Sequence, residues 1–103
     1  GNAVGAVCSR ISETMTLRIQ PMSDGGFQYV TPFGDTQEFL RVEDAIAKAQ
    51  ELTGQHVRRR ADHAGAKDIA LRMDVREVRF KDQMGMEHVN WIDVTARATG
   101  EPR

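Results

Sequence analysis

The sequence lacks the residues for an internal disulfide and the long apolar runs of a membrane-spanning segment. It contains one Cys among 103 residues, so no disulfide forms within the chain, and such sparse cysteine is typical of intracellular proteins. No stretch approaches the roughly 20 consecutive apolar residues that a membrane-spanning helix needs. The first residue is Gly rather than Met, and no signal peptide follows it. We therefore expect a cytoplasmic piece excised from a longer protein.

An excess of charge of one sign is also missing. The chain has fourteen Lys and Arg residues and fifteen Asp and Glu residues, which gives a net charge of -1. This near-neutrality removes the electrostatic attraction on which nucleic-acid binding relies. The length fits one domain and is too short for separate nucleotide and substrate lobes. We expect a single domain over residues 1–103, without linkers or repeats.

The opening segment has the spacing of a helix. Its apolar residues recur at offsets of three and four: Val4, Val7, Cys8 and Ile11. Asn2 suits the N-cap because its side chain accepts a backbone N–H of the first turn. Gly5 and Ala6 keep the helix slim, so a neighbouring backbone can approach closely. The pattern predicts a helix over residues 1–13.

The remaining segments predict two hairpins separated by a long helix. Apolar residues alternate over 14–20, turn residues fill 22–26, and a strand returns over 27–33, after which 36–41 is a short strand or the approach to a helix. An amphipathic stripe spans 42–65. Residues 69–80 and 88–100 form the second hairpin. A bulge near Arg76 would explain why the apolar residues fall on one face up to Val75 and on the other face from Val78. We expect an α+β fold in the order helix, hairpin, helix, hairpin, with about four antiparallel strands and both helices on one face.

Candidate catalytic and metal-binding residues are few. His56 and His63 are seven residues apart on the predicted helix, about 10 Å along its axis, which is too far to share a metal ion. His88 has no ligand motif around it, and Cys8 has no base beside it. We predict no catalytic, metal or cofactor-binding residue. An enzyme or ligand-binding domain would rest on the three His residues alone.

Trp91 is the best candidate for an interaction surface. It falls on the strand face opposite Ile92 and Val94. If no helix covers that face, Trp91 forms an exposed apolar patch with Val89 and Phe80, and such patches mark contact surfaces. The other interpretation is that Trp91 caps the edge of the domain's own core. The patch predicts an interaction module that dimerises through its sheet.

Three segments together resemble the C-terminal end of the hydantoinase/oxoprolinase family, in particular its hydantoinase A type of subunit. They are "GNAVGAVCSRISETMTLRI", "DGGFQYVTPFGDTQEFLRVEDAIAKAQEL" and "IDVTARATGEPR". The resemblance implies ATP-dependent opening of a cyclic amide such as hydantoin or 5-oxoproline, with ATP and Mg²⁺ bound upstream of this chain. It implies a docking domain that does not turn over substrate itself.

The same resemblance implies where the domain docks. Asn2, Gly5 and Ala6 match the junction between the ATP-binding part and the terminal domain. The implied partners are that upstream region and a second hydantoinase-type subunit, with neither nucleic acid nor membrane among them. Dimerisation of the isolated domain around Trp91 and Val89 is the alternative to this docking role.

Overall fold

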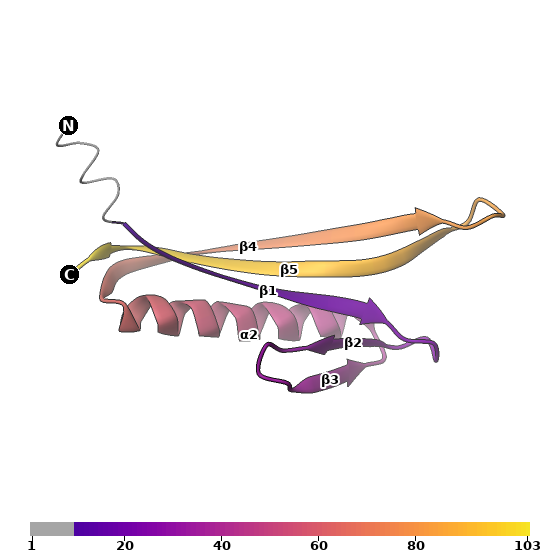
Figure 1. Cartoon of the computed structure of the whole chain (residues 1–103), viewed down its shortest axis with the longest axis horizontal. Helices are drawn as coiled ribbons and strands as arrows, with labels where there is room; N and C mark the ends of the chain where they lie inside the picture. Colours follow the sequence, from indigo (N-terminus) through magenta and orange to yellow (C-terminus); the bar gives the residue numbers. More distant parts are fainter. Residues whose placement is uncertain (1–9) are drawn as a thin grey trace.

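The computed structural model describes residues 10–103, which form one antiparallel sheet with one helix on it (Figure 1). The elements, in chain order, are β1 (Ile11–Pro21), β2 (Phe27–Val30), β3 (Thr36–Phe39), α2 (Val42–His63), β4 (Ala66–Lys81) and β5 (Glu87–Pro102). The strands lie in the order β3-β2-β1-β5-β4. The helix therefore carries the chain from one edge of the sheet to the other.

The core lies between α2 and the middle of the sheet. Alternate residues of the two central strands are buried there, because a strand turns successive side chains to opposite faces. The helix contributes small side chains, which let it approach the sheet closely. The buried set comprises Met15, Leu17, Ile19, Tyr29, Ala45, Ala49, Val57, Ala61, Ala66, Ile92, Val94, Ala96 and Ala98. Thr53, the one buried polar residue among those described, donates its hydroxyl to the Ala49 carbonyl oxygen at 2.8 Å.

The expected fold class is wrong in its numbers of helices and strands. The described residues contain one helix and five strands, so the strands outweigh the helix. Residues 11–13 of the predicted opening helix belong to β1, where Ile11 pairs with Gly100. The rest of that prediction, including Asn2, Gly5 and Ala6, lies outside the described residues. Ile11 belongs to a strand because it pairs with β5, which is far away in the sequence. The spacing of apolar residues within the segment contains no information about that pairing.

The fifth strand comes from residues 36–39, which form β3 instead of leading into the helix. Gly34 has a φ of +93°, a conformation that favours glycine, and it closes a turn in which the Thr31 N–H donates to the Asp35 carbonyl at 2.8 Å. The hairpin is then fastened by side chains. The Tyr29 hydroxyl donates to Gln37 Oε1 at 2.9 Å, and the Tyr29 and Phe39 rings lie 5.6 Å apart.

The other local predictions correspond to elements of the structure. The helix predicted over 42–65 runs from Val42 to His63, with Glu43 and Asp44 in its first turn. The second hairpin is present, and its bulge lies between Val78 and Arg79 rather than near Arg76. A further irregularity separates Lys67 from Ala70.

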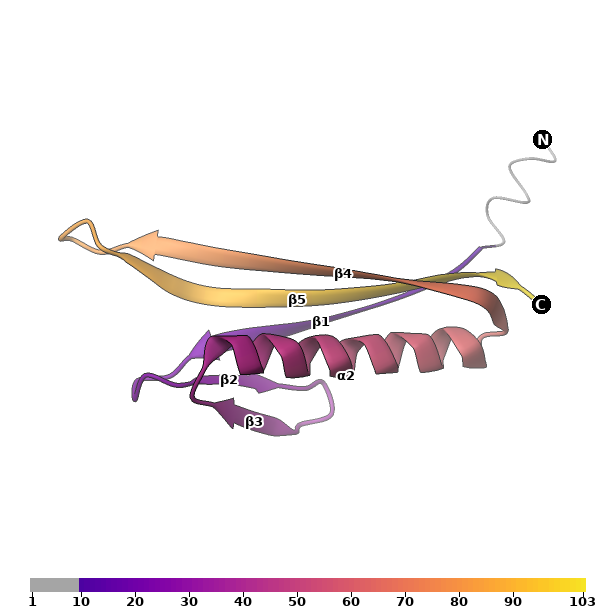
Figure 2. The same cartoon turned by 180° about the vertical axis from the view of Figure 1, so that it is seen from behind.

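The β4–β5 hairpin reaches well beyond the N-terminal end of α2 (Figures 1 and 2). Sixteen residues per strand span about 53 Å, whereas the 22 helical residues span about 33 Å. The overhanging turn is held by Asp82. Its Oδ1 accepts the N–H groups of Met84 and Met86 at 2.9 and 3.0 Å, and its Oδ2 lies 2.7 Å from His88 Nε2.

We predict that protonation of Asp82 loosens this turn. Hydrogen bonds, that of His88 foremost, lower the pKa of Asp82. The folded pKa lies below the unfolded one, so the stabilisation is complete above the ordinary aspartate pKa and is lost as the pH falls through the lowered value. NMR titration of the Asp82 carboxyl should give a low midpoint that rises in His88→Ala. His63→Ala is the control, and equal midpoints in wild type and His88→Ala would contradict the prediction.

Candidate functional site

The β4 edge of the sheet carries a stripe of exposed apolar side chains. Leu71, Met73 and Val75 alternate along β4 on the face that bears α2, and they are 39%, 42% and 40% exposed. Their cross-strand neighbours on β5 are Ala98, Ala96 and Val94, all of which are fully buried. The helix thus covers these β5 residues completely and their β4 neighbours only in part. We call Leu71, Met73 and Val75 the β4 stripe.

A groove of about 270 Å³ runs between α2 and part of the β4 stripe. Its helix wall contains Gln50, Gly54 and Arg58, and Met73 forms part of its other wall. A Cβ added at Gly54 would lie 2.6 Å from Met73 Cε, so the missing side chain lets the methionine reach the helix. The groove and the stripe together form one apolar surface along the β4 edge, which we call the apolar border.

The other face of β4 is charged. Arg72, Asp74 and Arg76 alternate there, opposite Arg97, Thr95 and Asp93 of β5. Arg72 therefore has a like charge as its neighbour within the sheet, an arrangement that destabilises a cross-strand pair. Among residues 10–103, neither Arg72 nor Asp74 forms an ion pair within 4.0 Å. Their charges remain available to a neighbour beyond the edge.

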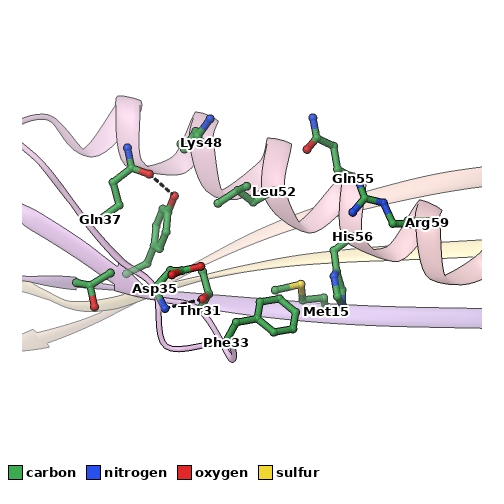
Figure 3. A pocket seen from close by; sticks show the side chains of 12 residues that line it. Met15, Thr31, Phe33, Asp35, Gln37, Lys48, Leu52, Gln55, His56 and Arg59 are labelled. Carbon is green, nitrogen blue, oxygen red and sulfur yellow. Dashed lines mark hydrogen bonds between the residues drawn. The ribbon is translucent and has the colours of Figure 1, made fainter.

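A second candidate site is a half-open pocket of about 340 Å³ between α2 and the β2–β3 hairpin (Figure 3). Met15 and Leu52 supply apolar surface, and the Phe33 and His56 rings lie 5.2 Å apart. Burial raises the pKa of Tyr29, and the charge of Glu51 adds to the effect, so the hydroxyl stays neutral. The Tyr29 hydroxyl donates its proton to Gln37 Oε1.

This pocket does not assemble a nucleophile with a base. Within the described part of the chain, no hydrogen bond joins His56 to a hydroxyl or a carboxylate. Lys48 lies 3.4 Å from Glu51, which offsets its charge. The lining offers apolar contact and scattered polar groups, an arrangement suited to binding a small molecule.

Trp91 lies on the sheet face away from the helix, half-buried beneath a charged side chain. The Arg18 guanidinium carbon lies 4.3 Å from the centre of the indole ring, and Arg18 also pairs with Asp93 at 2.9 Å. The hydrogen bond to Asp93 raises the pKa of Arg18. Phe80, Val89 and Trp91 line one shallow hollow, but Val89 also packs against the core. A cation therefore covers the patch predicted around Trp91.

The three His residues do not meet. His56 lines the pocket, His63 is exposed at the helix end, and His88 pairs with Asp82 in the distant turn. No three His, Cys, Asp or Glu side chains gather as metal ligands among residues 10–103. Sequence reasoning did not single out the β4 stripe, although the alternating signs of Arg72, Asp74 and Arg76 were visible.

Comparisons with protein families, curated proteins and solved structures find no match to this chain. Across the part that the structure describes, no helix has both the length and the apolar composition needed to cross a bilayer. The geometry of the chain itself is therefore the basis for a functional proposal.

Proposed function

We propose that this domain is a protein-association module that pairs with a second copy of itself along β4. The observation that carries the proposal is β4, a sixteen-residue strand that has a neighbour on one side only among residues 10–103 and that bears the stripe of half-exposed apolar side chains. A free edge presents unpaired backbone N–H and C=O groups, which a strand from another chain can satisfy. A cytoplasmic location, supported by the single Cys, is part of the proposal.

Strand length makes β4 better suited to pairing than the opposite edge of the sheet. The other edge strand, β3, has only four residues. Between its two irregularities β4 has a regular stretch over 70–78, so pairing would have a limited length. Two copies that meet through the same strand form an isologous contact, which closes after two subunits and does not grow into a fibre. The apolar border of each copy then covers that of the other.

Met73→Lys should abolish this association. The substitution places an ammonium group in the middle of the stripe, where pairing would remove it from water. We expect sedimentation velocity from micromolar to near-millimolar concentration to show wild type shifting from monomer to dimer and Met73→Lys staying monomeric. Met84→Lys is the matched control, because Met84 is 88% exposed in the hairpin turn. A monomeric wild type, or loss of the dimer in both variants, would contradict the proposal.

The docking role implied by the hydantoinase/oxoprolinase resemblance stays a prediction. The resemblance places docking at Asn2, Gly5 and Ala6, and the β4 edge is a second surface to which the same partner would fit. An apolar strand edge is also what a docking domain would present to the ATP-binding part of a longer chain or to a second subunit. Docking and self-pairing would then compete for β4. Binding of such a partner to wild type but not to Met73→Lys would favour the docking role.

A further inference from the structure

We infer that two copies pair antiparallel along β4 in one register, centred on Met73, in which Arg72 of each copy meets the partner's Asp74. This inference rests on the proposed function and adds the residues that select the partner. The two-fold axis stands perpendicular to the sheet at Met73. It joins the two five-stranded sheets into one of ten strands and keeps both helices on the same face.

Charge on the outer face of β4 favours this register. Within one copy Arg72 stands beside Arg97, and its opposite side faces the open edge. In the Met73-centred pair that side is occupied by the partner's Asp74, and the symmetry repeats the contact. Two attractive cross-strand pairs form, and each guanidinium gains a carboxylate neighbour in place of a like charge alone.

The helix-bearing face is matched in the same register. Leu71 lies opposite the partner's Val75, and Met73 lies opposite the partner's Met73. Directly opposite residues in an antiparallel pair have their Cβ atoms about 4.5–5.5 Å apart, close enough for these side chains to cover one another. The two grooves beside Gly54 then lie on either side of one continuous apolar strip.

Neighbouring registers lose one of these features. Centring the pair on Asp74 puts the two Asp74 carboxylates together and Arg72 against the partner's Arg76. Centring it on Arg72 opposes the two guanidinium groups. Centring it on Val75 keeps an ion pair between Asp74 and the partner's Arg76, but it places Met73 against the partner's Glu77. Only the Met73-centred register matches both faces.

The test is a charge exchange between two variants. Arg72→Asp and Asp74→Arg should each dimerise at least about tenfold more weakly than wild type, because each turns both ion pairs into like-charge pairs. Mixing the two variants should restore a dimer of wild-type strength, seen by sedimentation and identified as a heterodimer by native mass spectrometry. The double variant Arg72→Asp/Asp74→Arg should dimerise by itself. A mixture that stays monomeric, or rescue of Asp74→Arg by Arg76→Asp instead, would overturn the inference.

A crosslinking scan tests the register without altering charge at the ion pair. In a Cys8→Ser background, Met73→Cys should form an intermolecular disulfide rapidly, because residues opposite each other on the axis have Cα atoms within disulfide range. Val75→Cys should crosslink slowly. Faster crosslinking at Val75 would overturn the register while leaving the proposed association intact. A wild-type chain that is monomeric at every concentration would instead contradict both the register and the proposed association.

Discussion

Replacing Leu17 with Ala is expected to lower the free energy of unfolding by about 2–5 kcal/mol. Leu17 is 1% exposed in the central strand β1, opposite the fully buried Val94 of β5. The smaller side chain leaves a cavity between the sheet and α2, because the elements around it are already tied to one another and relax only in part. The loss of apolar contact therefore comes with the cost of empty space.

Chemical denaturation followed by circular dichroism measures this effect. It should be done at a concentration where the chain is monomeric, since association adds to apparent stability. Leu40→Ala is the control, because Leu40 is 91% exposed and its truncation should change the free energy by less than about 0.5 kcal/mol. Equal losses in the two variants would show that Leu17 is not a core residue.

Gly100→Ala should destabilise the domain by about 1–3 kcal/mol, whereas Gly54→Ala should leave stability unchanged or raise it by up to about 1 kcal/mol. A Cβ at Gly100 would lie 2.8 Å from Ala66 Cβ and 2.9 Å from the Lys67 carbonyl oxygen, so backbone would have to move. At Gly54 the neighbour is the flexible end of the Met73 side chain, and Ala has the higher helix propensity.

The two glycine variants can be compared directly, since each adds one methyl group to a buried glycine. Thermal and denaturant unfolding of the monomer should rank Gly100→Ala below wild type and Gly54→Ala level with it or above. The reverse order would mean that β4 yields at Lys67 more easily than the Met73 side chain rotates. In that case close approach of Met73 would be the reason why a glycine stands in the interior of α2.

Local periodicity was enough to predict most of the individual elements. Met15, Leu17 and Ile19 alternate with polar residues in the sequence, and the structure buries all three. The helix that begins at Val42 was equally predictable, because the 3.6-residue spacing of its apolar residues lies within the segment itself. These patterns depend on residues close together in the chain, so no knowledge of the sheet was needed.

The position of each strand in the sheet could not be predicted in the same way. Met73 and Val75 alternate in sequence much as Ile92 and Val94 do, yet the second pair is covered by α2 and the first is not. The difference arises because β5 lies inside the sheet and β4 at its edge, which pairing between distant segments decides. The candidate association site is thus a product of strand order, and alternation alone predicts only that one face is apolar.

The two ends of the described chain leave the sheet at the same pole. Ile11 pairs with Gly100, and Arg103 is tied back by its N–H to the Gly65 carbonyl at 2.9 Å and by its guanidinium to Asp62 at 2.8 Å. The tip of the β4–β5 hairpin lies at the opposite pole (Figure 2). The domain could therefore be inserted into a surface loop of a host protein without separating the two ends of that loop. The β4 edge would then extend away from the host and stay exposed.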